Sequence, residues 1–252
     1  MSQDGKNLGL NPRTLTIISH KLRTPLSIIN GYSEAILSQA RKEKFSPFTS
    51  KAFDEINKQG AHMSLLLNKL INFNHVLSAN ANQLEKKPIT LKPLIKENAS
   101  KAVAQEEDDS IMALPDEEKS FIKRGTSVEI DCSEKVAITA NEEMINLCVM
   151  ELLANAIKFN NKIEKIIKVQ VTNHGDSISI SVRDFGVGIR PQDVDNIFEP
   201  FYQVDDDFTG QINGWGLGLP MVKRILELHK GTVSVVSDRG LGSIFTVNFP
   251  IV

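Results

Sequence analysis

Residues able to do chemistry gather in a few short stretches of this 252-residue chain. In "SHKLRTPL", residues 19–26, Ile18 and Leu22 belong to an apolar series that leaves His20 facing outward. An ordinary histidine pKa of about 6.5 leaves one ring nitrogen unprotonated at neutral pH. His20 is therefore a candidate reactive imidazole. A solvent-exposed histidine without a role is the alternative.

Two glycine clusters follow much later in the chain. They are "DFGVGI" at 184–189 and "GWGLGL" at 214–219, and the second runs into the amphipathic stretch "PMVKRILELHK". Glycines before a helix let the backbone approach a phosphate, whose charge is favoured by free amides and by the helix dipole. A plain turn is the alternative for either cluster taken alone.

The elements that position these residues differ between the two halves of the chain. In the first half, apolar residues step mainly by three and four, which predicts two long helices separated at "KFSPF". The helical series comprise Leu15, Ile18, Leu22, Leu26, Ile29 and Ile36, then Phe53, Ile56, Met63, Leu67, Leu70 and Leu77. We expect an antiparallel hairpin that dimerises into a four-helix bundle, because two helices alone leave apolar stripes exposed. Packing of the hairpin against the rest of the same chain is the alternative.

The second half alternates strands with helices. Six segments rich in β-branched residues read as strands: 128–132, 135–139, 166–173, 177–184, 232–237 and 243–250. Helical stretches are expected at about 91–105, 141–160 and 219–229. This order predicts an α/β or α+β sandwich, a sheet covered by helices on one face. The acidic stretch 105–120 reads as a solvated insertion, with a helical turn or two allowed.

Composition limits the partners of the chain. A formal net charge of -2 and a pI near 6.2 give no basic field for nucleic acid. Cys132 and Cys148 show no metal-ligand or disulfide spacing, which favours a reducing compartment. No apolar run approaches the roughly 20 residues of a membrane span, and residues 1–9 lack signal-peptide features. We expect a cytoplasmic protein or the cytoplasmic part of a larger receptor, with no direct membrane insertion in this segment.

The order of motifs is more specific than any one of them. "SHKLRTPL", "ELLANAIKF", "DFGVGI", "FEPFYQVD" and "GWGLGL" follow one another in the order of the H, N, G1, F and G2 boxes of sensor histidine kinases. The chain resembles the transmitter region of that family over roughly residues 10–250. The resemblance implies a flexible tail at 1–9, a dimerisation and histidine-phosphotransfer hairpin at 10–82, and an ATP-binding domain of the gyrase, Hsp90 and MutL type at 83–252.

The resemblance also implies an activity and its partners. In the family, the histidine attacks the γ-phosphate of ATP, and the phosphoryl group passes to an aspartate on a response regulator. His20 stands at the phosphoacceptor position, and Thr24 resembles the residue that positions water for dephosphorylating the regulator. The upstream sensor domain that would supply the input is absent from this chain.

Nucleotide-binding roles carry over to named positions. Asn155 resembles the Mg²⁺ ligand, Lys158 can reach phosphate oxygens, and Phe159 can pack on adenine or belong to the core. Asp184 resembles the acceptor for the adenine amino group, a contact that selects adenine over guanine. The remaining expected nucleotide-binding residues are Gly186, Gly188, Tyr202, Gly214, Gly216, Leu217, Gly218 and Leu219. Tyr202 belongs with Phe198 and Phe201 to an expected aromatic hinge of the lid that runs to about Gly214.

Two positions and one stretch depart from the family pattern. Lys21 follows the histidine where an acid usually orients the imidazole and takes its proton, and a charged lysine cannot accept one. No lysine or arginine occurs from Gln203 through Trp215 to stabilise phosphoryl charge. Glu151 replaces a usual asparagine and can still contribute to Mg²⁺ or orient water. The sequence thus leaves two readings open, a slow or conditional kinase and a nucleotide-binding dimeric scaffold without phosphoryl transfer.

Overall fold

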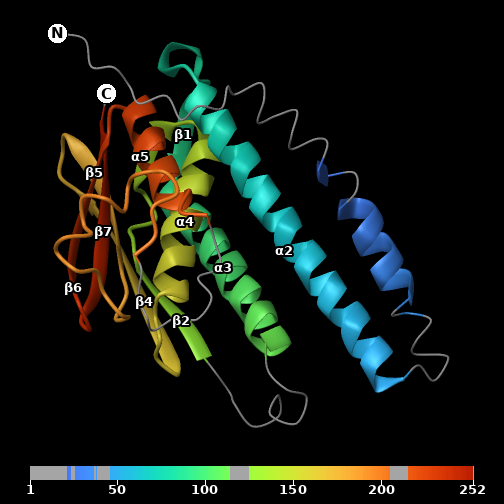
Figure 1. Ribbon diagram of the computed structural model, residues 1–252. Helices are drawn as coiled ribbons and strands as arrows, with labels where there is room; N and C mark the ends of the chain where they lie inside the picture. Colours follow the sequence, from blue (N-terminus) through green and yellow to red (C-terminus); the bar gives the residue numbers. More distant parts are fainter. Residues whose placement is uncertain are drawn as a thin grey trace. The chain divides into compact units, whose positions relative to one another are not determined.

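The computed structural model describes residues 22–23, 26–36, 38, 46–113, 125–204 and 215–251. The chain divides into two compact units (Figure 1). One ends at Ser78 and takes in the stretch Asn213–Leu217, and the other comprises Ala79–Ile212 and Gly218–Val252.

The first unit is a helical hairpin. Its second arm is the 32-residue helix α2 (Pro47–Ser78), and its first arm is helical at residues 22–23, 26–36 and 38. α2 begins sharply because the Ser46 hydroxyl accepts a hydrogen bond from the Thr49 amide at 3.1 Å. Pro47 takes the first helical position, where no backbone donor is needed.

Contacts between the two arms run in opposite directions along the chain. Arg23 donates to the Asn68 Oδ1 at 3.3 Å, and Asn30 donates to the Ser64 hydroxyl at 3.4 Å, so a later residue in one arm meets an earlier one in the other. This order confirms the predicted antiparallel hairpin. The buried apolar residues of this unit include Leu26, Leu67, Leu70, Phe73 and Val76.

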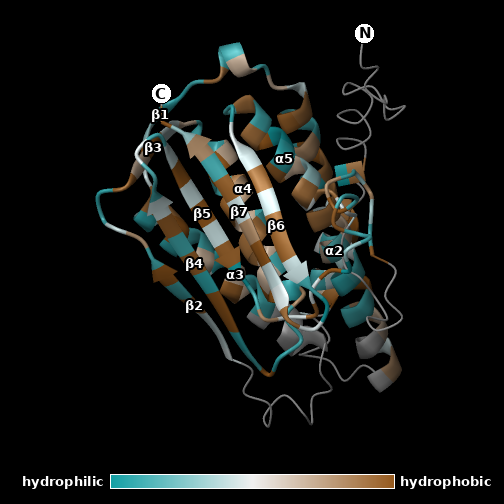
Figure 2. Ribbon diagram, turned by 90° about the vertical axis from the view of Figure 1, so that its left-hand side faces the viewer, coloured by the Kyte–Doolittle hydropathy of each residue, from teal (hydrophilic) through white to brown (hydrophobic). Residues whose placement is uncertain are grey.

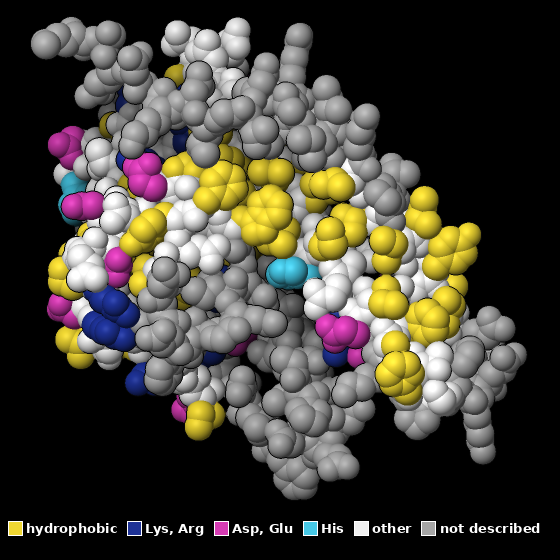
Figure 3. All heavy atoms as spheres, viewed as in Figure 1, with side chains coloured by type: hydrophobic (Ala, Val, Ile, Leu, Met, Phe, Trp, Pro, Cys, Tyr) yellow, Lys and Arg dark blue, Asp and Glu magenta, His cyan; other side chains and the backbone are white. Residues whose placement is uncertain are grey.

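Much of the apolar stripe of the hairpin faces outward. On the face seen in Figure 3, apolar side chains gather over the helical arms. The exposed large apolar residues of the hairpin are Leu22, Ile28, Ile29, Tyr32, Phe48, Ile56, Met63, Leu65 and Leu77. Some residues of the predicted helical series are therefore buried, and others are exposed.

The second unit is built on a five-stranded sheet with the order β2-β4-β5-β7-β6. The strands are β2 (Gly125–Asp131), β4 (Glu164–Asn173), β5 (Ser177–Arg183), β6 (Thr232–Asp238) and β7 (Gly242–Pro250). β2 pairs with β4 in parallel, and every other neighbouring pair is antiparallel. A separate small sheet joins β1 (Lys87–Thr90) to β3 (Ala137–Ala140).

Helices cover one face of the large sheet (Figure 2). They are α3 (Leu91–Ala113), α4 (Glu142–Lys158) and α5 (Gly218–Leu228), and a short 3₁₀ helix, η1 (Ala81–Gln83), precedes β1. Every second residue of the central strands is buried beneath these helices, as Ile167 and Val169 in β4 show. The predicted helix-covered sandwich is confirmed.

The structure contains one strand that the sequence did not predict. β1 was not predicted, because "KPIT" is only four residues long and contains a proline. The stretch 105–120 begins with about two helical turns, as the sequence allowed, since α3 continues to Ala113. Its glutamate, alanine and methionine residues have high helix propensity, which explains the extension. Among the residues described, no helix is both long and apolar enough to cross a bilayer.

Candidate functional site

Helix α4 carries the first group of predicted site residues. The Asn141 side chain caps it by accepting a hydrogen bond from the Met144 amide at 3.1 Å. Two acids in its first turn interact favourably with the positive end of the helix dipole. One face of α4 lies in the core and is formed by Met144, Ile145, Cys148, Val149, Leu152, Leu153, Ala156 and Ile157. The other face presents Glu151, Asn155 and Lys158, spaced four and three residues apart.

These three side chains place oxygen ligands and a positive charge along one face of α4, toward its C-terminal end. Glu151 and Asn155 are half-buried and supply carboxylate and amide oxygens, whereas Lys158 is exposed. Phe159, the C-cap residue, is 38% exposed, so its ring is not enclosed in the core. The Lys158 Nζ lies 4.9 Å from the centre of that ring, within the range of a cation–π interaction.

The loop 184–189 leaves the end of β5 and packs on the end of α4. The Val187 amide donates to the Phe159 carbonyl at 3.1 Å. A Cβ placed on Gly186 would lie 2.1 Å from that same carbonyl oxygen and 2.8 Å from the Asn160 Cα. Only glycine fits at this approach, and it brings the loop of Asp184 beside the α4 end that carries Asn155.

Asp184 is the buried acid of this loop. It is 4% exposed, and its Oδ1 accepts a hydrogen bond from the Gly186 amide at 2.8 Å. Burial raises the pKa of the Asp184 carboxyl, while backbone amide hydrogen bonds from Gly186 and Ser243 oppose the rise. A carboxylate held in this way is a directed hydrogen-bond acceptor.

The turn between β6 and β7 holds the same loop from the other side. The Ser237 hydroxyl accepts from the Ile189 amide at 2.8 Å and donates to the Gly242 carbonyl at 3.0 Å. The Gly240 amide donates to the Val187 carbonyl at 2.7 Å. Gly188 has φ 65°, and a Cβ there would lie 2.0 Å from the Asp238 carbonyl oxygen.

Sequence reasoning missed this supporting turn. Ser237 lies 48 residues from its partner Ile189, and no local pattern links the two. The two glycines of "GLGS" at 240–243 were the available signal, and both have positive φ in the structure.

The second glycine cluster lies at the start of α5. Gly216 has φ 64°, Leu217 is buried, Gly218 is the first residue of α5, and Leu219 is half-buried. α5 packs against α4, so the two helices that carry predicted site residues are neighbours. Gly214 lies outside the described residues.

The Tyr202 side chain is held by a hydrogen bond to Asp193. Its phenol donates to the Asp193 Oδ1 at 2.7 Å, within the turn-rich segment that follows the 184–189 loop. The preceding Phe201 has φ 65° and is half exposed. A positive φ at a phenylalanine is strained, and such strain gathers where chains bend for function. The position fits the expected hinge, and most of the expected lid, from residue 205, lies outside the described residues.

The two predicted residues of the phosphotransfer helix, His20 and Thr24, also lie outside the described residues. Lys21 does as well. Their roles stay predictions from the sequence.

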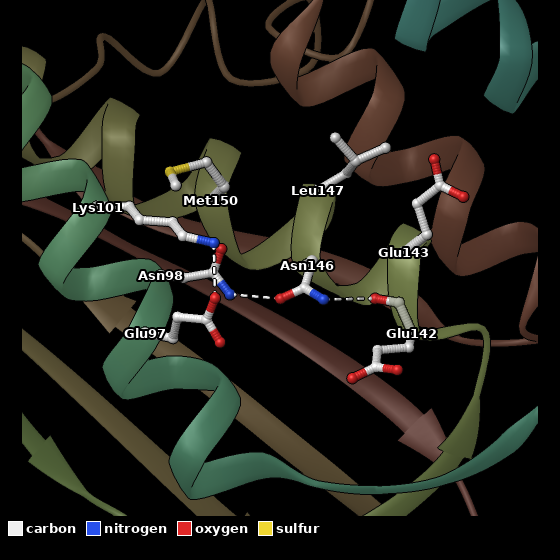
Figure 4. Close-up of a pocket in the computed structure, with 8 residues that line it drawn as sticks. All are labelled: Glu97, Asn98, Lys101, Glu142, Glu143, Asn146, Leu147 and Met150. Atoms are coloured by element: carbon white, nitrogen blue, oxygen red, sulfur yellow. Dashed lines mark hydrogen bonds and ion pairs between the residues drawn. The ribbon is translucent and has the colours of Figure 1, made fainter.

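A separate open groove of about 490 Å³ lies between α3 and α4 (Figure 4). It is lined by Glu97, Asn98, Lys101, Glu142, Glu143, Asn146, Leu147 and Met150. The Asn98 amide donates to the Asn146 Oδ1 at 2.7 Å and ties the two helices together. None of the predicted nucleotide-binding residues lines this groove, so it is distinct from the site at the other end of α4.

The buried cysteines add no reactive group to this site. Burial raises the pKa of the Cys148 thiol to about 12, and burial also raises the pKa of Cys132. Both thiols therefore stay protonated near neutral pH.

Comparison with known proteins assigns both units. Residues 13–77 match the family model of the His Kinase A (phospho-acceptor) domain. Residues 140–252 match the model of the histidine kinase-, DNA gyrase B-, and HSP90-like ATPase. The two matches lie in the order that the motifs predict.

Similarity to known proteins extends over nearly the whole chain. The sensor histidine kinase YkoH of Bacillus subtilis is 31% identical over 92% of this chain and 46% of its own length. The non-motile and phage-resistance protein of Caulobacter vibrioides is 28% identical over 94% of this chain and 27% of its own length. The crystal structure of full-length ShkA in complex with AMPPNP shares the fold, with a TM-score of 0.71 at 23% identity over 96% of this chain and 46% of that one.

The chain spans less than half the length of these relatives. Its two units, their order and the motifs within them are those of one family. The chain belongs to the sensor histidine kinases and forms their transmitter region, a phospho-acceptor hairpin followed by an ATPase-type domain.

Proposed function

We propose that this chain is an ATP-dependent protein histidine kinase, which transfers the γ-phosphoryl group of ATP to His20 and then to an aspartate of a response regulator. The two family models and the sensor kinases among its relatives support the proposal. The observation that carries it is the close packing of Gly186 against Phe159 and Asn160. With that packing, the Asp184 loop and the α4 end that bears Asn155 would line one nucleotide site.

The base of the nucleotide would be read by Asp184. Its carboxylate accepts from the adenine amino group, whereas guanine offers a carbonyl oxygen at that ring position. The exposed ring of Phe159 would stack on the base, and Lys158 would meet phosphate oxygens. The amides of Gly216 and Gly218 would approach the phosphates at the start of α5. The AMPPNP bound to ShkA, which has the same fold, is consistent with this assignment.

A Mg²⁺ ion would be held by Asn155 with help from Glu151. Their amide and carboxylate oxygens are four residues apart on one half-buried face of α4, and hard cations prefer such oxygen donors. The residues present therefore fit the ion. When bound, Mg²⁺ would supply positive charge to the triphosphate.

Phosphoryl transfer would begin at the unprotonated nitrogen of His20. That nitrogen attacks the γ-phosphorus, an N–P bond forms as the bond to the bridging oxygen breaks, and ADP leaves. In the second step, a regulator aspartate takes the phosphoryl group and frees the imidazole. Thr24, one helical turn after His20, would position water for later dephosphorylation of the regulator.

The hairpin would act as a homodimer. Residues 10–82 would form the dimerisation and phosphotransfer domain, and residues 83–252 the ATP-binding domain. The exposed apolar residues of both arms supply the surface that a four-helix bundle would bury. Because the proposed substrates are ATP and a response regulator, we infer a cytoplasmic location for this region.

Lys21 and the absence of lysine and arginine from residues 203–215 should make the kinase slow. Each missing acid/base or electrostatic group costs on the order of 10² in rate. The second candidate function is a nucleotide-binding dimeric scaffold without phosphoryl transfer, and the lysine at position 21 is the observation that favours it.

Incubation with γ-labelled ATP and Mg²⁺ separates the two functions. The experiment compares the native chain with the variants His20→Ala and Lys21→Glu. The kinase predicts acid-labile, base-stable label in the native chain, no label in His20→Ala, and faster labelling in Lys21→Glu. Label that persists in His20→Ala would refute the assignment of the acceptor. Label confined to Lys21→Glu would support the scaffold and identify the lysine as its cause.

A further inference from the structure

Lys165 is a charged side chain on the covered face of the sheet. It lies near the start of β4, with the same strand parity as the buried Ile167 and Val169, so it points toward the helices. Its side chain is only 13% exposed. Lysine is seldom found so enclosed without specific partners, and here the partners are known.

Three elements meet at the Lys165 ammonium. It donates to the Ile157 carbonyl at 3.0 Å and forms an ion pair with Glu106 of α3, whose side chain is 17% exposed. The other Glu106 oxygen accepts from the Thr126 hydroxyl. Thr126 is the register partner of Lys165 in the parallel β2–β4 pair. The cluster therefore joins α3, α4, β2 and β4.

The contact with Ile157 is the informative one. Ile157 lies in the last turn of α4, between Asn155 and Lys158, and its carbonyl accepts the Asn160 amide at 3.3 Å as well as the Lys165 ammonium at 3.0 Å. The ammonium is the shorter of the two contacts and matches the negative end of the helix dipole. The neighbouring Phe159 carbonyl in turn accepts the Val187 amide of the Asp184 loop. The Lys165 ammonium thus ties the helix end on which that loop rests to β4 and, through Glu106, to α3.

The cluster adds polar ties at this end of α4, beside the core packing of Ala156 and Ile157. The Asn98–Asn146 hydrogen bond ties α3 to α4 nearer the start of α4, eleven residues before Ile157 (Figure 4). At the other end, the Glu106–Lys165 pair is the corresponding tie between α3 and the sheet beside Ile157. A surface ion pair would lack this consequence, because exposed pairs contribute little to stability or geometry.

We propose that Lys165 is a positioning residue for nucleotide binding, which holds the last turn of α4 so that Asn155, Lys158 and the Asp184 loop keep their mutual geometry. The inference rests on the proposed nucleotide site. It adds a residue that touches no nucleotide and acts through the Ile157 carbonyl.

The experiment compares five chains by ATP titration calorimetry with Mg²⁺, well below their melting temperatures. They are the native chain, Lys165→Met, Lys165→Arg, the double variant Lys165→Met with Glu106→Gln, and Lys168→Met. The double variant avoids leaving a partly buried carboxylate unpaired. Lys168→Met is the matched control, since Lys168 lies on the same strand and pairs with Glu129 of β2 at 3.1 Å but is half exposed.

We expect both variants with methionine at 165 to bind ATP about tenfold more weakly than the native chain, the effect of losing one hydrogen bond from a charged group. Lys165→Arg should recover most of the affinity, and Lys168→Met should bind as the native chain does. Folded variants with methionine at 165 that bind ATP with native affinity would overturn the positioning role. A purely structural role would lower the melting temperature and leave this affinity unchanged.

Hydrogen exchange without nucleotide gives an independent readout. The amides of Phe159, Asn160 and Val187 depend on the α4 end and should exchange faster in the double variant, but not in Lys168→Met. Unchanged protection at all three would contradict the inference by itself. If exchange responds as expected but the native chain binds no adenine nucleotide, the positioning of the α4 end stands, the proposed function fails, and nucleotide binding cannot be its purpose.

Discussion

At the scale of single residues, Asp184 shows how burial and hydrogen bonding prepare one oxygen for recognition. Its side chain is 4% exposed and is held by the Gly186 amide, so its orientation is fixed before any ligand arrives. Pre-organised acceptors of this kind discriminate strongly against a partner that lacks the matching donor. The proposed adenine contact is therefore open to a single-atom test.

Asp184→Asn should remove that contact and leave the loop folded. The asparagine oxygen can still accept from the Gly186 amide, but its NH₂ group would face the adenine amino group, donor against donor. We expect ATP affinity to fall about 10- to 100-fold by calorimetry, with little change in melting temperature. Native-like ATP affinity in this variant would show that Asp184 does not read the base.

His229 is a second residue whose surroundings select one protonation state. Its Nε2 accepts from the Asn141 amide at 3.1 Å, and its Nδ1 lies 2.7 Å from the Ile225 carbonyl. Both contacts are satisfied together only by the neutral ring with a proton on Nδ1. Burial lowers the pKa of His229, and nearby Lys86 lowers it further, against the opposing Ile225 carbonyl.

The direction of this shift predicts acid sensitivity. Because the folded pKa lies below the unfolded value of about 6.5, the unfolded chain binds the proton more readily as the pH falls. The stability contribution is complete above about pH 6.5 and is lost as the pH falls toward the folded pKa. Urea unfolding at about pH 7.5 and 5.5 should show a smaller pH dependence in His229→Gln than in the native chain.

His174→Gln serves as the control for that measurement, because His174 is a surface residue of the same unit. It should retain the native pH dependence. Equal pH dependence in the native chain and in His229→Gln would contradict the assignment of a buried neutral imidazole.

At the scale of elements, the β6–β7 turn clamps the 184–189 loop. The two segments exchange hydrogen bonds through Ser237 and Gly240, and Gly188 lets their backbones approach closely. The loop is therefore held between α4 on one side and the turn on the other. Its rigidity is a property of three elements together.

Gly188→Ala tests the clamp. A Cβ there adds two costs, because the residue has φ 65° and the new atom would lie 2.0 Å from the Asp238 carbonyl oxygen. Gly175→Ala isolates the first cost, since Gly175 has φ 90° and open space around it. We expect a loss of about 1 kcal/mol for Gly175→Ala and about 3 kcal/mol or more for Gly188→Ala in urea unfolding. Similar losses in both would mean that the close approach is not needed.

Local patterns predicted most of these elements, and long-range partners account for what they missed. Helical spacing predicted α2, and runs of β-branched residues predicted the five strands of the large sheet, with α3, α4 and α5 expected between them. β1 was too short to show a period. Ser237 and Lys165 were missed because their partners lie 48 and 59 residues away, where no spacing rule reaches. Glycine motifs predicted the loops but not the turn that supports them.

At the scale of the whole molecule, the hairpin leaves large apolar side chains exposed to solvent. Ile56 and Met63 of α2 are about half exposed, as is Ile29 of the first arm, although all three belong to the predicted helical series. Exposed apolar patches of this kind mark interaction surfaces. A second copy of the hairpin is the partner that the four-helix bundle predicts.

Ile56→Glu should therefore separate the dimer. A charge at this position would have to be desolvated in the bundle, at a cost of several kcal/mol. Light scattering after size exclusion should report a dimer for the native chain and a monomer for this variant. Val236→Glu is the control, because Val236 is an equally apolar, 70% exposed residue of the sheet. A native chain that is monomeric at micromolar concentration would contradict the bundle.

Locating the phosphoryl group after reaction decides whether this chain is a histidine kinase. The chain is incubated with ATP and Mg²⁺ at neutral pH, digested under mildly basic conditions, and sequenced by fragmentation mass spectrometry. We expect one phosphoryl group on the imidazole of His20, and less of it in Asp184→Asn when ATP does not saturate the weakened site. A chain that binds ATP but carries phosphate elsewhere, or none even with Lys21→Glu, would contradict this assignment.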